Sequence, residues 1–166
     1  MRYRSLFTTI VLLFALFSLK AQNDYFFAEG TRFDPKIPSP EKYLGYPIGT
    51  LHTRHDAIVG YMRELARISD RAKLDTIGET YEHRQLVVLT ITSPENHRNL
   101  ESIRKEHLKL TDPTQSVGDY TDMKSVVLLG YNVHGNEPSS SEAAMLTAYY
   151  YVAGQSAEVR AALKDA

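Results

Sequence analysis

The spacing of hydrophobic positions predicts an amphipathic helix and then a β-hairpin in the first half of the chain. Between residues 53 and 69 the apolar positions recur three or four residues apart, as on one face of a helix. They are Ile58, Met62, Leu65 and Ile68. Residues 75–81 and 85–92 are β-rich runs on either side of a short polar turn, so they predict two antiparallel strands. The second run is the more apolar, and we expect it to be the more buried strand.

Two stretches are expected to lie outside this regular pattern. Residues 22–52 contain several prolines and scattered aromatic residues, which favours an extended lead-in over a helix. Residues 93–122 are mostly polar, with apolar positions for one short helix before turn-rich sequence at Pro113 and Gly118. This second stretch is either a surface excursion or a rim over a cleft, and its polar composition favours the surface excursion.

A short strand and a second helix are predicted further along the chain. Residues 125–130, Ser-Val-Val-Leu-Leu-Gly, form an apolar run typical of a central strand that is covered on both faces. Residues 142–152 are good helix formers that end at Gly154, and Pro138 suits a first helical turn. Ser139 and Glu142 have the spacing of a capping box.

The first 21 residues have the features of a signal peptide in the expected order. Arg2 and Arg4 give a positive start, residues 6–19 are nearly all apolar, and Ala21 offers a small residue for cleavage. The apolar run is shorter than the roughly 20 residues that span a bilayer. We therefore expect export to the periplasm or the extracellular space, with no permanent membrane span after cleavage.

Composition narrows the class of protein further. The chain has 166 residues, of which 43% are hydrophobic and 23% charged, as in an ordinary globular protein with a single core. It has no cysteine, which excludes disulfide frameworks, thiolate zinc sites and cysteine nucleophiles. The formal net charge is −1 and no basic stripe is present, so nucleic acid is not an expected partner. Any metal must be held by histidine and carboxylate.

His134 and Glu137 are the candidate metal ligands. They lie three residues apart, between the predicted strand and the predicted helix, where open α/β sheets bind their ligands. Glu137 precedes Pro138, so its backbone is biased away from the helical region and the pair is expected on a turn. Two such side chains can converge on one ion at about 2.0–2.2 Å, and Gly135 leaves space beside it. The alternative is a hydrogen-bonded turn without a metal.

Three motifs together match the pattern of a known family. They are His134-Gly-Asn-Glu-Pro138 with Glu142, the hairpin Ile77-Gly-Glu-Thr-Tyr-Glu-His-Arg84-Gln-Leu86, and the helix over residues 63–74. In these motifs the chain resembles the zinc carboxypeptidases related to carboxypeptidase A, especially the exported bacterial members. The resemblance implies an α/β, mixed-sheet zinc carboxypeptidase-like fold that is incomplete here. Residues 53–166 would form its N-terminal part, with the hairpin, one central strand and flanking helices.

The resemblance also implies an activity and the roles of two residues. His134 and Glu137 would be the first two Zn²⁺ ligands of a metallocarboxypeptidase that hydrolyses C-terminal peptide bonds of proteins or cell-wall peptides. Family members take a third ligand, a histidine, and a general-base glutamate from further along the chain. No histidine follows Glu137 here, so we expect no catalytic residue within this chain and an inactive fragment of an active parent. Asn136 and residues 139–141 depart from the family pattern, which leaves substrate preference open.

Two other functions share the metal motif. Zinc deacylases that act on N-acyl amino acids also carry His-Gly-x-Glu, and an exported binding module could keep the fold without catalysis. The upstream helix, the hairpin and the export signal favour the carboxypeptidase. We expect His52 and His55 to be polar residues at a helix start, and His97 and His107 to be solvated, so none of them is expected to be a further ligand.

Overall fold

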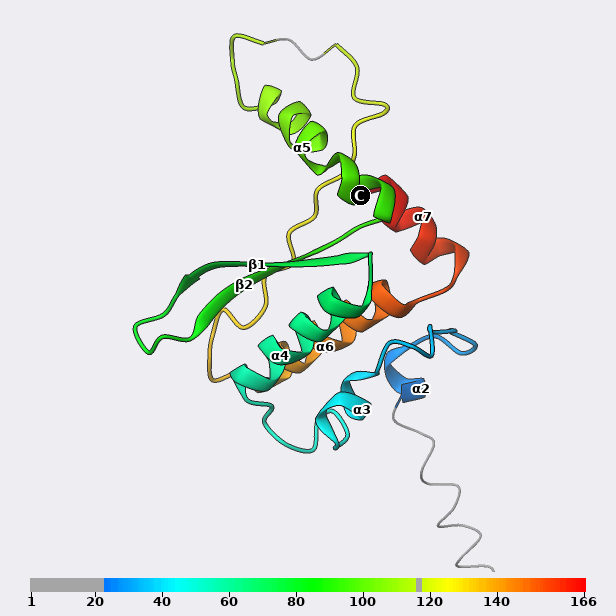
Figure 1. The fold of residues 1–166 in the computed structure, drawn as a ribbon, viewed down its shortest axis with the longest axis vertical. Helices are drawn as coiled ribbons and strands as arrows, with labels where there is room; N and C mark the ends of the chain where they lie inside the picture. Colours follow the sequence, from blue (N-terminus) through cyan, green and yellow to red (C-terminus); the bar gives the residue numbers. More distant parts are fainter. Residues whose placement is uncertain (1–22, 116–117) are drawn as a thin grey trace, which may run out of the picture. The chain divides into compact units, whose positions relative to one another are not determined.

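A computed structural model describes residues 23–115 and 118–166 (Figure 1). The signal peptide predicted for residues 1–21 lies outside the described residues. The chain divides into two compact units, residues 1–31 and residues 32–166, of which the first contains the short helix α2 (Asn23–Phe26). The elements of the second unit are α3 (Pro40–Leu44), α4 (His55–Ile68), β1 (Ala72–Glu79), β2 (Gln85–Ile91), α5 (Pro94–Lys109), α6 (Pro138–Ala153) and α7 (Ala157–Asp165).

Helix α4 follows the predicted apolar spacing closely. It covers His55–Ile68, which confirms the helix expected between residues 53 and 69. Its apolar face is buried, and Tyr61 and Leu65 are 0% exposed. The Tyr61 hydroxyl donates to the carbonyl of Pro38 at 3.0 Å, and burial raises the pKa of this phenol above its ordinary value. The phenol is therefore a neutral donor inside the core.

The hairpin confirms the second element expected from the sequence. Strand β1 pairs antiparallel with β2 from Ala72↔Ile91 onward, and a register shift interrupts the ladder between Thr76 and Gly78. The strand β1 begins three residues before its predicted start, and β2 is the less exposed of the two, as expected. His83 adopts a left-handed φ of 58° at the tip, where a tight turn reverses the chain.

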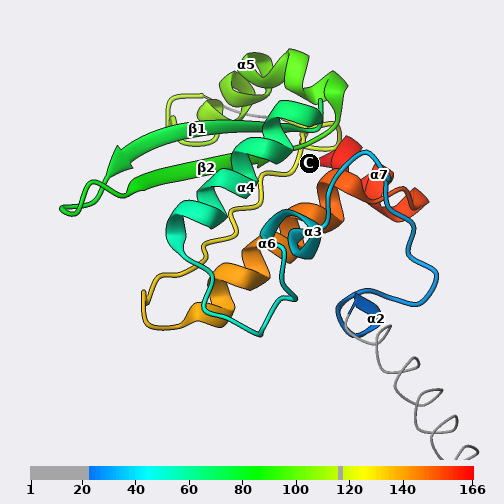
Figure 2. The same ribbon diagram turned by 60° about the horizontal axis from the view of Figure 1, so that its bottom comes forward.

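Helices α4 and α6 cover one face of this hairpin and contact each other (Figures 1 and 2). The α/β class with an N-terminal hairpin and flanking helices is therefore confirmed. The core lies where these elements meet, because α6 is apolar around most of its circumference and needs cover on several sides. The large, fully buried side chains of this core include Tyr61, Leu65, Met145, Val152 and Val159. Among the described residues, none of the helices is long and apolar enough to cross a membrane.

Arg71 closes the C-terminal end of α6. Its guanidinium donates to the carbonyl of Gly154 at 2.7 Å, to that of Val152 at 3.3 Å and to that of Tyr151 at 3.5 Å. The last carbonyls of a helix have no partner within the helix, and they carry the negative end of its dipole. One arginine therefore joins the start of β1 to the end of α6.

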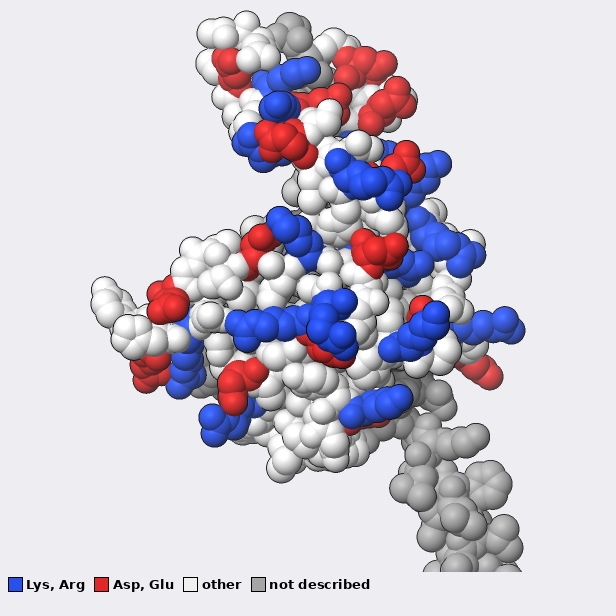
Figure 3. Space-filling model, in the orientation of Figure 1, with Lys and Arg blue, Asp and Glu red and all other residues white. Residues whose placement is uncertain are grey.

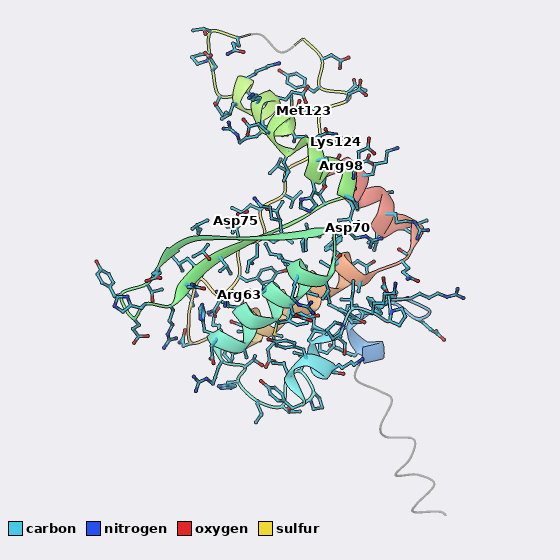
Figure 4. The ribbon with its side chains drawn as sticks, in the orientation of Figure 1. Arg63, Asp70, Asp75, Arg98, Met123 and Lys124 are labelled. Carbon is cyan, nitrogen blue, oxygen red and sulfur yellow. The ribbon has the colours of Figure 1, made fainter. Side chains whose placement is uncertain are left out.

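We expect Arg71→Ala to lower the free energy of unfolding by about 1–2 kcal/mol, since charged hydrogen bonds to helix-end carbonyls are lost. Urea unfolding followed by circular dichroism measures the change. Arg98→Ala, at an exposed arginine on α5 (labelled in Figure 4), is the matched control and should change stability by less than about 0.5 kcal/mol. Equal effects of the two substitutions would contradict this assignment.

The strand predicted for residues 125–130 does not form, and this part of the prediction is wrong for the structure. The segment has no strand pairing within the described residues, and its side chains are exposed, with Val126 at 71% and Leu128 at 86%. The amide of Ser125 donates instead to the carbonyl of Asp165 at 2.8 Å. A strand requires a neighbouring backbone that completes its hydrogen bonds, and an apolar sequence cannot supply one.

Other boundaries differ from the sequence-based expectations for local reasons. Helix α6 begins at Pro138, which confirms this proline in the first helical turn, and Glu137 is the N-cap residue. The capping box of Ser139 and Glu142 is therefore wrong. Helix α5 is longer than the short helix that was expected. It begins directly after Ser93, whose hydroxyl caps the helix by accepting a hydrogen bond from the amide of Asn96 at 3.2 Å. Helix α7, which was not predicted, is capped in the same way by Ser156.

The predicted polar excursion consists of α5 and the loop that returns from it. His107 on α5 places its Nε2 2.6 Å from the carbonyl oxygen of Lys124, near the end of that loop. His107 is therefore tied to the loop, and the expectation that it is simply solvated is wrong. His97 is half-buried, and its Nε2 atom is buried without a hydrogen-bond partner among the described residues, so this histidine is only partly solvated.

Candidate metal centre

The turn that carries His134 and Glu137 is folded back on the start of α6. The amide of Glu137 donates to the carbonyl of His134 at 3.1 Å, and the amide of Ser140 donates to the carbonyl of Glu137 at 3.2 Å. Asn132, at the beginning of the turn, has a left-handed φ of 57°, and its amide donates to the Ser140 hydroxyl at 2.8 Å. These bonds bring both candidate ligands to the N-terminal end of one helix.

The two candidate ligands face each other. The Nδ1 atom of His134 lies 3.3 Å from Oε1 of Glu137, and the side chains are 70% and 59% exposed. This separation is longer than the roughly 2.8 Å of a hydrogen bond between charged groups. Two ligands of one tetrahedral zinc, each about 2.0–2.2 Å from the ion, lie about 3.4 Å apart. The contact is a long hydrogen bond between the two side chains, as in a turn without a metal, and the same separation is compatible with two positions around a zinc ion.

The surroundings of the pair leave room for an ion and a substrate. A Cβ atom added at Gly135 would meet nothing within 4 Å, and residues 131–137 are all exposed. Glu137 is the N-cap residue of α6, and its side chain makes no capping hydrogen bond. The free amides of the first helical turn favour negative charge nearby, which suits a carboxylate ligand or a developing oxyanion.

The remaining histidines do not join the pair. Within residues 23–115 and 118–166, no group of three histidine, aspartate or glutamate side chains is arranged to hold a metal. His55 begins α4, with its Nε2 3.0 Å from the carbonyl oxygen of Gln85, and Arg63 on the same helix contacts the Gln85 side chain (Figure 4). His55 therefore has the structural role expected of it, and His52 is an exposed residue before the helix.

Sequence reasoning missed the role of Glu142, the buried carboxylate of α6. It is 6% exposed and accepts from the Thr53 hydroxyl at 2.8 Å and from the Gly49 amide at 2.9 Å. Since the Thr53 hydroxyl gives its proton to Glu142, the Tyr46 hydroxyl at 3.1 Å must donate to Thr53. The network ties the lead-in to the helix that follows the candidate ligands. Its partners lie so far apart in the sequence that spacing could not reveal it.

Comparison with known proteins adds one finding. The family model described as zinc carboxypeptidase matches residues 58–166, which include most of α4, the hairpin, the His134–Glu137 turn and all that follows. Searches of curated proteins and of solved structures gave no match. The matched residues make up well over half of the chain, and the ligand pair lies within them. The chain therefore belongs to the zinc carboxypeptidase family.

Proposed function

We propose that this chain is the N-terminal part of an exported zinc carboxypeptidase that removes C-terminal residues from proteins or cell-wall peptides. Membership of the zinc carboxypeptidase family supports a hydrolase of the carboxypeptidase type. The observation that carries the proposal is the 3.3 Å approach of His134 Nδ1 to Glu137 Oε1 on an exposed turn. That arrangement offers two zinc ligands on a surface that a peptide can reach.

His134 and Glu137 would hold the metal in this proposal. When bound, zinc is a Lewis acid that polarises a peptide carbonyl and makes a water molecule acidic enough to attack it near neutral pH. The carboxylate of Glu137 offsets part of the positive charge, while the imidazole of His134 is a neutral ligand. The first turn of α6 directs its free amides towards the same region, where they favour the negative charge of a substrate carboxylate.

The exposed apolar segment before the turn supports a longer parent protein. Val126, Val127, Leu128 and Val133 are each at least 70% exposed. Exposed apolar side chains gathered in one short segment are typical of a site that another chain segment covers. We propose that later residues of the parent cover it, and that they also supply a histidine as the third ligand and a glutamate as the general base.

The substrate proposed for this site is a peptide chain with a free C-terminus. On the face shown in Figure 3, lysine and arginine side chains alternate with aspartate and glutamate, without a continuous basic stripe. That distribution supports a protein substrate over nucleic acid, whose binding needs several phosphate contacts from one basic surface. Export to the periplasm or beyond remains part of the proposal, on the strength of the first 21 residues.

The test is to compare the complete gene product with the 166-residue chain. We expect the complete protein to hold zinc and to release C-terminal residues from peptides, with loss of activity in a chelator and recovery on zinc addition. The 166-residue chain should bind zinc weakly and hydrolyse nothing, because two ligands leave the ion mostly hydrated and no base is in place. If the complete protein hydrolyses only N-acyl amino acids, the alternative function as a deacylase is correct. If it hydrolyses nothing, the alternative function as a non-catalytic binding module is correct.

A further inference from the structure

We propose that Ser140 is a positioning residue for the metal centre, and that its hydroxyl holds the turn of His134 and Glu137 in a shape that binds zinc. The inference rests on the proposed function, since it concerns the same ligand pair. It assigns a task to a side chain that neither contacts the ligands nor belongs to the metal motif.

Ser140 is bonded to both ends of the turn. Its Oγ accepts from the amide of Asn132 at 2.8 Å, and its own amide donates to the carbonyl of Glu137 at 3.2 Å. The loop closed by the first bond contains His134 and Glu137. One residue in the first turn of α6 therefore fixes the beginning of the turn through its side chain and the end of the turn through its backbone.

Packing does little to hold this turn, so hydrogen bonds must define its shape. Every residue from 131 to 137 is exposed. Asn132 has a φ of 57°, in the left-handed region that residues with a side chain adopt at a cost. Asparagine adopts this conformation more readily than most residues with a side chain, and the bond from its amide to Ser140 fixes it at this point of the turn.

A second hydrogen bond, made by the residue before Asn132, also holds the start of the turn against α6. The Tyr131 hydroxyl donates to the Thr147 hydroxyl at 2.9 Å, two helical turns after Ser140. Tyr131 and Asn132 are thus both held against α6 by hydroxyl groups of that helix. The Tyr131 bond fixes the approach of the chain, whereas the Ser140 bond fixes the backbone of the turn itself.

The chain provides a matched control at the neighbouring serine. Ser139 lies in the same helical turn, and its hydroxyl makes no hydrogen bond among the described residues. Alanine favours a helix at least as well as serine, so neither Ser139→Ala nor Ser140→Ala should weaken α6 through helix propensity. The two variants differ in whether the bond to Asn132 is lost.

The first measurement uses the 166-residue chain without metal. Amide hydrogen exchange followed by nuclear magnetic resonance should show the Asn132 amide protected in the wild type, in Ser139→Ala and in Ser140→Thr, which keeps a hydroxyl. In Ser140→Ala this protection should fall by about tenfold or more, while amides in α4 remain unchanged. Unchanged protection of Asn132 in Ser140→Ala would overturn the proposal, because the bond would then have no effect on the turn.

The second measurement uses the complete protein and Co²⁺ as a spectroscopic probe of the metal site. Ser140→Ala should weaken Co²⁺ binding by about tenfold and alter its visible absorption, a loss typical of removing a group that orients a ligand. Ser139→Ala should bind like the wild type, and Ser140→Thr should recover most of the affinity. Wild-type affinity and spectrum in Ser140→Ala, or equal losses in both alanine variants, would overturn the inference.

These outcomes separate this inference from the proposed function. A wild-type complete protein that binds neither Zn²⁺ nor Co²⁺ would refute the proposed function, whatever the Asn132 amide does. A wild type that binds the metal and is unaffected by Ser140→Ala would refute the positioning role alone. If Ser140→Ala does not fold, Ser140→Cys keeps the size of the side chain but replaces the hydroxyl by a weak acceptor, and it is judged by the same two measurements.

Discussion

Replacement of His134 by alanine in the complete protein is expected to abolish release of C-terminal residues and to lower zinc affinity by more than about 100-fold. Loss of a group that only orients a ligand already costs about 10–100-fold in affinity or activity, so loss of the ligand itself should cost more. Glu137→Ala should have the same effect. Both side chains are mostly exposed, at 70% and 59%, so the free energy of unfolding should change little.

Zinc content, peptide hydrolysis and urea unfolding of the same preparations test this expectation. His52→Ala and His107→Ala are the controls, because neither histidine lies with the ligand pair, and both should keep zinc and turnover. Normal zinc content and normal turnover in Glu137→Ala would show that the pair is not the metal centre. A loss of zinc in the controls as well would indicate general unfolding.

The second large effect is expected in the core, where Leu65→Ala should lower the free energy of unfolding by about 2–5 kcal/mol. Leu65 lies on α4 and is 0% exposed. Its truncation removes apolar contacts and leaves a cavity that the surrounding helices and hairpin can fill only in part. Guanidinium unfolding of the 166-residue chain, followed by circular dichroism, gives the change from the shift in midpoint.

A matched leucine on another helix controls for the chemical change. Leu108 lies on α5 and is 48% exposed, so Leu108→Ala should cost less than about 1 kcal/mol. If the two substitutions had the same effect, α4 would not be packed as described. A changed slope of the transition in only one variant would mean that the midpoints cannot be compared directly.

The elements that sequence predicted well are those whose hydrogen bonds are local. Helix α4 satisfies its backbone within itself, and the hairpin within a short stretch of chain, so apolar spacing and turn residues suffice to find them. Residues 125–130 are different, because a strand depends on a neighbour that its own sequence does not specify. The apolar run predicted burial, whereas the described residues leave Val126 and Leu128 exposed.

In the candidate site, too, local spacing predicted some features, whereas others depend on contacts that the sequence does not reveal. The spacing of His134 and Glu137 predicted that their side chains meet on a turn, and the structure brings them within 3.3 Å. Their role as ligands stays a prediction. The Ser140 hydroxyl could not be assigned from spacing, since serines in a row look alike until the left-handed backbone of Asn132 selects one of them. Glu142 looked like a capping residue, but its partners are Gly49 in the lead-in and Thr53 just after it.

The carboxylate of Glu142 also has a consequence for the order in which the chain folds. Its bonds to Gly49 and Thr53 join residues 93 and 89 positions apart, whereas the strands of the hairpin meet across a few residues. Closing a long loop costs more entropy than closing a short one, so contacts distant in sequence form late. The hairpin and α4 can assemble early, and the lead-in can contact α4 through the bond of Tyr61 to Pro38, but the segment from Gly49 to Thr53 can dock only after α6 is in place. We therefore expect this segment to be among the last parts of the unit to become ordered and among the first to open.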